Sequence, residues 1–501
     1  MKVRITAFIE RRSLALILAL GLIVRLMRIG SRGLEYDDTF SIFLSERSLP
    51  EIVRGTAADT MPPLYYFLLH FWMGLGSWLG IAHSAWFLRL LSVLFSLIAV
   101  YLLYQLVLLL FSDRRSALLA GLLASISPFQ YYHAQDVRNY ALLLCAELGY
   151  LIFFVRIWKG GAGKWVNWLG LVLCALAGMY THNVAVFALG LPNLFLLMQR
   201  RWKLFGQLVI AQLGIGLLTL PWLLELPGQL AKVQRAWWLW QPGLIDFLQI
   251  PVVWSAGLPL PGIWLWIGIF LGLEILAILL IETFKIRGET GIVFLALITL
   301  GLPVLLVIGS YLIRPIFVPR AFILASMSFY GLAGGAIVAG WKKGGGKILL
   351  GGLLAAALIG LPAQAEFNSF PRSPFEEAAK DLAGRVKANE LVVHDNKLSY
   401  FPFRFYQPDL RSSFVADEPG SGNDTFALDS QKAMAIFPAQ DLETAVGNSQ
   451  GIYFVLFNQA IQDYKAIGVV RHPALDWLDQ HYHFVDHMTY NDLEVFYYTR
   501  P

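Results

Sequence analysis

Charged residues and cysteines are scarce in this sequence. Only 15% of the 501 residues are charged, whereas 57% are hydrophobic. Such a high and continuous apolar content excludes an ordinary soluble protein. The two cysteines, Cys145 and Cys174, lie inside apolar runs, so the sequence implies no disulfide framework. The sequence also lacks a glycine-rich loop for nucleotide phosphates, and nothing in it predicts a nucleic-acid partner.

Long apolar runs dominate the first part of the chain instead. They measure about 18 to 25 residues, the length that a helix needs to cross a hydrocarbon layer of about 30 Å. They predict about eleven spans, at residues 13–30, 86–111, 116–133, 139–158, 165–182, 184–199, 204–224, 261–284, 290–312, 320–341 and 347–363. The basic N-terminus resembles a signal peptide, but no small-residue cleavage site follows it, so we interpret it as a retained first span.

The composition changes at Glu366, after which polar residues occur at the density of a globular domain. We therefore expect a mainly α fold class, a polytopic membrane helix bundle with a small C-terminal soluble α/β domain. The bundle is predicted over residues 1–365, with a large first external loop at 31–85, and the soluble domain over 366–501. Within that tail the pattern predicts a helix at 374–388, strands at 391–393 and 451–456, a helix at 475–480 and two terminal strands. The His394-Asp395-Asn396 run is interpreted as a turn.

Basic residues indicate the orientation of the chain. With the N-terminus in the cytoplasm, most Lys and Arg clusters fall in cytoplasmic loops, as the positive-inside rule requires. The tail is then extracytoplasmic, and the protein is a multi-pass component of the cell (inner) membrane. Residues 62–80 are apolar enough to span, but a span there would turn those basic clusters outward. We therefore predict an interfacial helix at 62–80, with a further span as the alternative.

In this topology the unusual polar residues collect at the outer ends of the spans. Ionisable groups beside hydrocarbon are costly and usually mark a functional site. The candidates are Asp37, Asp38 and Asp59 in the first external loop, Gln135, Asp136 and Arg138 between the third and fourth spans, Tyr140 near the start of the fourth, His182 at the end of the fifth, and Arg320 at the start of the tenth.

Each group also has a structural explanation. Asp37 and Asp38 could cap a short helix, because carboxylates suit helix N-termini. Asp136 and Arg138 could form an ion pair that only joins helices, and His182 could be part of a polar turn. These alternatives remain open from the sequence alone.

Several of these residues lie in motifs of a known family. The motifs are Tyr36-Asp37-Asp38, Asp59-Thr60-Met61-Pro62-Pro63-Leu64-Tyr65-Tyr66, Arg89-Leu90-Leu91-Ser92, Ser127-Pro128-Phe129-Gln130-Tyr131-Tyr132-His133-Ala134-Gln135-Asp136-Val137-Arg138-Asn139-Tyr140 and Arg320-Ala321-Phe322-Ile323-Leu324. In this order they resemble the dolichyl-phosphate-mannose protein mannosyltransferase superfamily, including its bacterial members. Four positions depart from the family pattern: Asp38 and Asp136 replace glutamates, Met61 replaces a histidine, and Ala321 replaces a tyrosine.

The resemblance implies the GT-C fold and an inverting glycosyltransferase that uses a polyprenyl-phosphate-linked sugar as donor. The acceptor hydroxyl would belong to a lipid, a glycan or a protein. Such a reaction needs a base for the acceptor proton and cations for the leaving phosphate. We expect Asp37 to be the base, with Asp38 and Asp136 as further catalytic carboxylates, and Arg138 and Arg320 to bind the phosphate. Gln135, Tyr140, His182 and Asp59 are expected to bind substrate.

No cofactor is firmly implied. A divalent cation is an alternative partner for the phosphate, with Asp37, Asp136 and His182 as conceivable ligands, although no tight ligand spacing is present. A polytopic transporter or flippase for a lipid-linked glycan is the competing class of protein. Transporters commonly contain internal repeats and polar breaks at mid-membrane, which this sequence does not show.

Overall fold

The computed structural model describes residues 2–366, 368 and 372–501. Contacts divide the chain into two units. The helical unit comprises residues 1–29, 60–231 and 239–366, and the tail unit comprises residues 30–59, 232–238 and 367–501. The first external loop is thereby split at Asp59, and its first half is grouped with the tail. The domain boundary predicted from the sequence places residues 30–59 with the membrane bundle instead.

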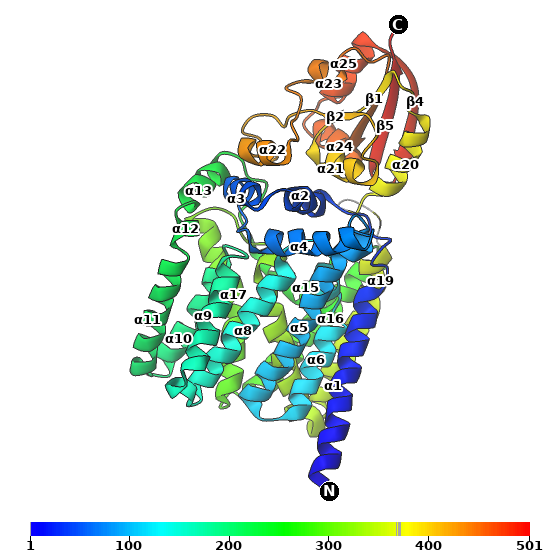
Figure 1. Cartoon of the computed structure of the whole chain (residues 1–501). Coiled ribbons are helices and arrows are strands. Elements are labelled where there is room, and N and C mark those ends of the chain that lie inside the picture. Colours follow the sequence, from blue (N-terminus) through cyan, green and yellow to red (C-terminus); the bar gives the residue numbers. More distant parts are fainter. Residues whose placement is uncertain (1, 367, 369–371) are drawn as a thin grey trace. The chain divides into compact units, whose positions relative to one another are not determined.

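The helical unit confirms the mainly α fold (Figure 1). Its helices are α1 (Lys2–Leu26), α4 (Leu64–Trp78), α5 (Ala85–Phe111), α6 (Arg114–Ser125), α7 (Pro128–Ala134), α8 (Tyr140–Trp158), α9 (Trp165–Met179), α10 (Ala185–Met198), α11 (Trp202–Leu218), α12 (Leu220–Leu223), α14 (Leu244–Leu248), α15 (Ile250–Ser255), α16 (Ile263–Lys285), α17 (Thr290–Leu312), α18 (Ile323–Gly340) and α19 (Gly345–Glu366). Helix α13 (Leu226–Arg235) begins in this unit and ends in the tail unit. Short 3-10 turns lie at Gly161–Gly163 (η1), Pro319–Phe322 (η2) and Trp341–Lys343 (η3).

Six segments of the described residues are long and apolar enough to cross a membrane. They are α5, α8, α16, α17, α19 and the stretch Pro319–Lys343 around α18. Helix α11 and the following helical segment, bent by 66°, would together make a seventh. The count of about eleven spans, and the interfacial placement of residues 62–80, stay predictions.

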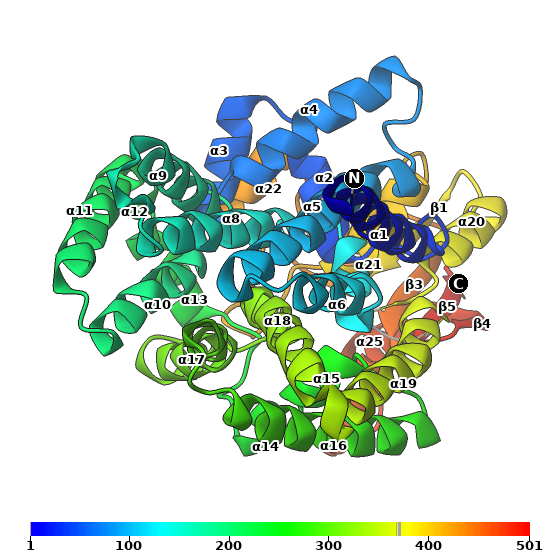
Figure 2. The same ribbon diagram turned by 90° about the horizontal axis from the view of Figure 1, so that it is seen from below.

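Helix α18 forms the centre of the helical unit. It packs against α5, α6, α8, α17 and α19, and Figure 2 shows it among these helices. The contact with α6 is close, because a Cβ atom on Gly334 would lie 2.4 Å from the carbonyl oxygen of Ser116. The turn η2 leads directly into α18. Arg320, which lies in η2, is therefore held at the end of the most buried helix.

The predicted span at 116–133 is two helices rather than one. Helix α6 ends at Ser125, and α7 begins at Pro128. Proline lacks a backbone N–H and suits the first turn of a helix, and the Ser127 hydroxyl accepts the N–H of Gln130 at 3.2 Å. The Ser-Pro pair therefore starts a new helix, which carries the chain towards the candidate residues after Ala134.

The side chain of Arg25 in α1 contacts the chain where α6 ends and α7 begins. Its side chain is fully buried. The guanidinium donates to the carbonyl oxygens of Ala124 and Ser125 and to the hydroxyl of Ser96. These carbonyls end α6 and have no partner within the helix, so a cation there is favourable. Arg25 thus joins α1, α5 and α6.

The tail unit contains a five-stranded sheet with helices around it (Figure 1). Its elements are α2 (Tyr36–Ser45), α3 (Leu49–Ala58), α20 (Phe375–Arg385), β1 (Glu390–His394), α21 (Lys397–Tyr406), β2 (Ser412–Phe414), α22 (Leu428–Met434), α23 (Leu442–Val446), β3 (Gly451–Phe457), α24 (Asn458–Ala466), α25 (Pro473–His481), β4 (His483–Tyr490) and β5 (Leu493–Thr499). The strand order is β2-β1-β3-β5-β4. Strand β1 pairs in parallel with β2 and β3, whereas β5 pairs antiparallel with β3 and β4.

The predicted helices and strands of the tail are confirmed as α20, β1, β3, α25, β4 and β5. Strands β1 and β3 are buried along their whole length, which explains why they read as continuous apolar runs. The run after His394 is a turn, as predicted. There the side chain of Asn396 accepts the N–H of Leu398 at 2.9 Å and starts α21. Helix α21 and strand β2 were not anticipated by the pattern.

Candidate active site

The connection between α7 and α8 is fixed by Gln135. Its side-chain amide donates to the carbonyl oxygens of Arg25 and Met27, each at 2.8 Å. The backbone carbonyl of Gln135 accepts the Nε of Arg89, whose Nη1 also donates to the carbonyl of Ile29. All of these groups belong to the helical unit. The amide of Gln135, predicted to bind substrate, therefore holds the loop that carries Asp136 and Arg138.

Asp136 forms a close pair with His133 of α7. The carboxylate Oδ2 lies 2.8 Å from the imidazole Nδ1, and both side chains are largely buried. The two residues are three positions apart, so the last turn of α7 brings them together. A histidine that shares a proton with a carboxylate can orient that carboxylate. His133 was missed by the sequence analysis, although this spacing was visible in its motif.

Tyr140, the first residue of α8, lies near His133 and two of the candidate residues, His182 and Arg320. Its ring centroid lies 5.7 Å from that of His133 and 6.2 Å from that of His182. The guanidinium carbon of Arg320 lies over the same ring at 5.8 Å. A cation at this distance from an aromatic face is attracted by the ring quadrupole. The tyrosine is itself buried and forms the wall that these groups share.

Arg138 belongs to the same cluster. It is 8% exposed, and its Nη1 donates to the Tyr66 hydroxyl at 3.5 Å. The neighbouring Asn139 donates its side-chain N–H to the carbonyl of Thr181 at 2.7 Å. This bond ties the start of α8 to the loop that carries His182. The helical unit thus gathers Asp136, Arg138, Tyr140, His182 and Arg320, which the sequence had placed at separate span ends.

His182 is a neutral imidazole in this cluster. Burial, together with the positive charges of Arg138 and Arg320, lowers the pKa of His182 to about 3. Its Nδ1 accepts the N–H of Val184 at 3.2 Å, which places the ring proton on Nε2. Two guanidinium groups beside a neutral N–H donor form a site that favours an anion.

The lowered pKa of His182 predicts a loss of stability in mild acid. An unfolded histidine binds a proton below about pH 6.5, whereas the folded one stays neutral down to about pH 3. The free energy of unfolding is therefore highest above about pH 6.5 and decreases as the pH falls. At pH 5 the decrease is about 2 kcal/mol. We expect His182→Asn to lose less stability than the wild type between pH 7.5 and pH 5, measured by chemical unfolding in detergent.

The matched control for this prediction is His481→Asn, at an exposed position in α25. It should leave the pH dependence unchanged. Equal pH dependence in wild type and His182→Asn would show that His182 is already charged or solvated in the folded chain.

The tail unit contains Asp37, Asp38 and Asp59, the candidate carboxylates of the loop predicted at 31–85. Asp38 is buried, and its Oδ2 accepts the N–H of Glu35 at 3.1 Å in a capping box at the start of α2. The capping role considered for this pair therefore applies to Asp38. Asp37 lies in the same first turn and is half-buried. Of the two, Asp37 is the one without a role in the capping box.

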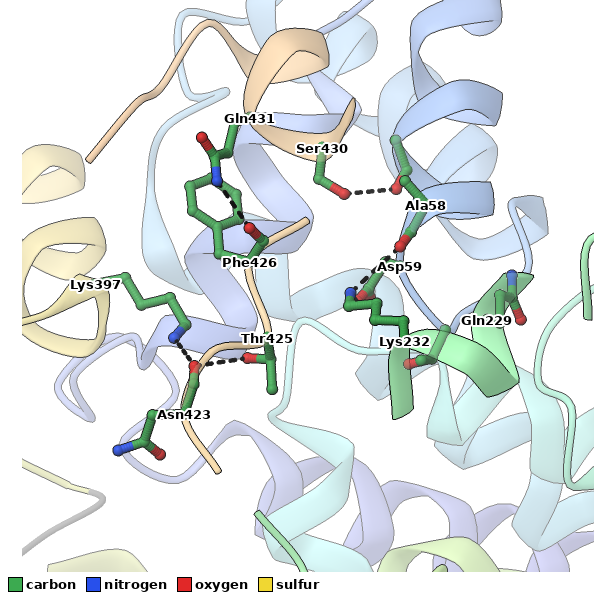
Figure 3. Close-up of polar contacts among 12 residues, drawn as sticks. Ala58, Asp59, Gln229, Lys232, Lys397, Asn423, Thr425, Phe426, Ser430 and Gln431 are labelled. Carbon is green, nitrogen blue, oxygen red and sulfur yellow. Dashed lines mark hydrogen bonds and ion pairs between the residues drawn. The ribbon is translucent and has the colours of Figure 1, made fainter. Parts of the chain in front are cut away.

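Asp59 is engaged in an ion pair within the tail unit. Its Oδ1 lies 3.0 Å from the Nζ of Lys232, which also donates to the carbonyl of Ala58 at 3.3 Å (Figure 3). Lys232 lies in the last part of α13. The pair joins the end of α3 to the segment after the bent helices, so Asp59, which was predicted to bind substrate, has a visible structural partner.

Metal ligands are not grouped anywhere in the described ranges 2–366, 368 and 372–501. No three His, Cys, Asp or Glu side chains there could hold one metal ion together. The divalent cation considered from the sequence stays a proposal, and the cationic groups that the helical unit does assemble are Arg138 and Arg320.

Comparisons with known proteins agree with the motifs. Residues 60–224 match the family model described as dolichyl-phosphate-mannose-protein mannosyltransferase. Curated protein sequences give no match. Among solved structures, ArnT from Cupriavidus metallidurans is similar with a TM-score of 0.64 and 13% identity, over 96% of this chain and 97% of that one. ArnT bound to undecaprenyl phosphate gives a TM-score of 0.62 and 13% identity, with the same two coverages, 96% and 97%.

The archaeal oligosaccharyltransferase AglB from Archaeoglobus fulgidus is similar as well, with a TM-score of 0.55 and 10% identity over 99% of this chain and 74% of that one. At these identities the structural matches establish the fold. The family match covers the segment with the Pro-Pro, Arg89 and Asp136-Arg138 motifs. Over residues 60–224 the chain is therefore similar to this mannosyltransferase family, its fold is the GT-C fold of the similar structures, and the resemblance predicted from its motifs is confirmed.

Proposed function

We propose that the chain is an integral-membrane inverting glycosyltransferase that moves a sugar from a polyprenyl-phosphate carrier to an acceptor hydroxyl at the extracytoplasmic face. The observation that carries this proposal is the cluster of Arg138, Arg320 and the neutral His182 near Tyr140, in which Arg138 and His182 are buried and Arg320 is half-buried. Guanidinium groups bind phosphate strongly because their N–H groups match its oxygens. A lipid phosphate is the anion that a site among apolar helices would meet.

In the proposed reaction, the Asp37 carboxylate takes the proton from the acceptor hydroxyl. The acceptor oxygen forms a bond to the anomeric carbon from the side opposite the phosphate. The bond between that carbon and the phosphate oxygen breaks, and its electron pair leaves with the polyprenyl phosphate. Arg138 and Arg320 stabilise the charge that develops on this leaving group. Attack from the opposite side inverts the configuration of the anomeric carbon.

Similar proteins support a lipid-linked donor. The ArnT structure of the same fold contains undecaprenyl phosphate, and that of AglB contains a dolichol-phosphate and an inhibitory peptide. For this chain we propose a polyprenyl-phosphate sugar as donor and a lipid, glycan or protein as acceptor. The distribution of basic residues supports a cytoplasmic N-terminus and an extracytoplasmic tail in the cell (inner) membrane.

The test uses the purified full chain with undecaprenyl-phosphate carrying a radiolabelled sugar, and an extract of the cell envelope as the source of acceptor. Glycosyl transfer releases free undecaprenyl phosphate and moves the label onto another molecule. A flippase would move the intact labelled lipid across a vesicle membrane without cleaving it. Intact donor after incubation with a set of hexose and pentose donors would contradict the proposal.

Adding EDTA to the same assay tests whether turnover requires a divalent cation. If the two arginines suffice to neutralise the leaving phosphate, turnover survives chelation. Loss of turnover that Mg²⁺ or Mn²⁺ restores would assign part of that task to a divalent cation.

A further inference from the structure

The first turn of α2, which carries Asp37, is packed against α21 inside the tail unit. The Tyr36 ring meets the Phe401 ring edge-on at 5.0 Å, and Phe40 and Phe43 also contact Phe401. Phe40, Phe43 and Phe401 are all buried. Ring contacts of this kind contribute beyond simple burial because their geometry is specific. The tail therefore supports the segment that holds the proposed base.

This contact lies at a particular edge of the sheet. Helix α21 follows the carboxyl end of β1, and the segment from Val415 to Asp417 follows the carboxyl end of the parallel strand β2. In open α/β sheets, ligands bind outside the carboxyl ends of the strands. Here α2 packs on the helix that begins at that edge. The segment that carries Asp37 is therefore packed near the edge of the sheet at which such folds commonly bind ligands.

Lys397 is a charged residue at this edge. It is only 2% exposed, and its ammonium group donates to the Asp417 carboxylate and to the carbonyl oxygen of Asn423 (Figure 3 draws the second contact). These two partners lie at the two ends of the 417–423 loop. The same ammonium group lies 5.8 Å from the centroid of the Tyr36 ring. One cation therefore joins the loop to the first residue of α2.

The charges around Lys397 favour this arrangement. Burial lowers the pKa of Lys397, whereas the carboxylates of Asp417 and Asp424 act in the opposite direction and favour the ammonium form. The positive charge of Lys232 also lowers the pKa of Lys397. A buried ammonium group needs a paired carboxylate to remain charged, and Asp417 provides it.

We propose that Lys397 is a positioning residue for glycosyl transfer, which fixes the first turn of α2 and thereby the direction of the Asp37 carboxylate. The inference rests on the proposed role of Asp37 as base. A carboxylate that shifts by about 1 Å loses its alignment with the acceptor proton, and such a shift can lower the rate by about 100-fold. Donor binding does not depend on this alignment, so kcat should change and the donor KM should not.

The test is the double variant Lys397→Met with Asp417→Asn. Removing Lys397 alone would leave a buried carboxylate without its cation, which is strongly destabilising. The double change removes both charges, so the chain should fold with a near-native melting temperature. We expect kcat to fall by about 10-fold or more, with the donor KM within about 3-fold of wild type, as expected for lost alignment. Amide hydrogen exchange should rise at residues 35–45 and stay constant in the membrane helices.

The matched control is Lys432→Met with Asp429→Asn, an exposed ion pair on α22 of the same tail unit. It should leave kcat, KM and exchange at residues 35–45 unchanged. If the first double variant does not fold, Phe401→Leu makes the same test without a change of charge, because Phe401 also contacts Tyr36.

A folded Lys397→Met/Asp417→Asn chain with wild-type kcat would overturn the positioning role. That outcome is distinct from failure of the proposed function, in which the wild-type chain itself releases no polyprenyl phosphate. An equal fall in kcat with Asp37→Asn already present would also contradict it, because Lys397 is proposed to act through Asp37.

Discussion

Asp37→Asn is expected to lower kcat by about 100- to 10,000-fold, the usual contribution of a general base. The amide keeps the shape of the carboxylate but cannot accept the acceptor proton. Donor affinity and melting temperature should remain close to wild type, because the capping box at the start of α2 uses Glu35 and Asp38. Single-turnover release of polyprenyl phosphate, together with donor Kd from equilibrium binding, measures both quantities.

Asp38→Asn is the matched control for Asp37→Asn. Its side-chain oxygen can still accept the N–H of Glu35, so the cap survives and the charge is lost one position away. We expect a much smaller fall in kcat for this control. If Asp37→Asn retains more than about a tenth of the wild-type rate, general-base catalysis at the usual magnitude does not occur at Asp37. The base would then be sought at Asp38 or Asp136.

Helix positions were predictable from the sequence because burial in lipid needs continuous apolar runs. The predicted spans at 86–111 and 290–312 coincide closely with α5 (Ala85–Phe111) and α17 (Thr290–Leu312). The apolar run at 116–133 is continuous, so hydropathy predicts one helix there. Hydropathy alone does not show that the run divides into two helices. The signal that was overlooked is chemical, namely Ser127 followed by Pro128, a serine cap before a proline in the first turn.

The candidate residues of the helical unit were predicted, but several of their partners were not. Gln135 was expected to bind substrate, whereas its amide donates to the carbonyls of Arg25 and Met27, more than 100 positions earlier. No local pattern encodes a contact at that separation, because the packing of α1 against the rest of the unit sets it. The predicted role of Gln135 in substrate binding therefore stays untested, while its structural role is visible.

In the tail, too, contacts between residues far apart in the sequence were not predictable. Its central strands were recognisable as apolar runs, yet Lys397 and Asp417 resemble ordinary surface residues in the sequence. Lys397 is buried because both ends of the 417–423 loop contact its ammonium group, and this places the half-buried Asp417 carboxylate beside it. No catalytic group is recognisable in the sequence of the tail, and no pattern there predicts that α21 packs against α2.

Arg138→Ala is expected to reduce turnover by at least about 100-fold, because removal of one group that stabilises developing negative charge commonly costs that much. Arg138 is buried beside Tyr66 and raises the local positive potential at His182. Arg138→Lys keeps the charge and loses the planar fork, so its effect should be intermediate. The donor KM should rise in both variants, in contrast to Asp37→Asn, since phosphate is bound before and after transfer.

Arg156→Ala provides the control for Arg138→Ala. Arg156 is exposed at the opposite end of α8, where its guanidinium lies over the Phe153 ring at 5.3 Å. Arg138 lies just before the start of α8, so Arg156→Ala removes the same charge at a distance from the cluster. We expect wild-type donor affinity and turnover for this variant.

The competing explanation is that Arg138 only stabilises the folded chain by pairing with Asp136. In that case Arg138→Ala would lower the melting temperature, and the double variant with Asp136→Asn would restore both the melting temperature and turnover. The structure gives Asp136 a second partner, His133 at 2.8 Å, so its carboxylate keeps a hydrogen bond when Arg138 is removed. We therefore expect the double variant to remain inactive. Unchanged donor affinity and turnover in folded Arg138→Ala would show that the phosphate is held elsewhere.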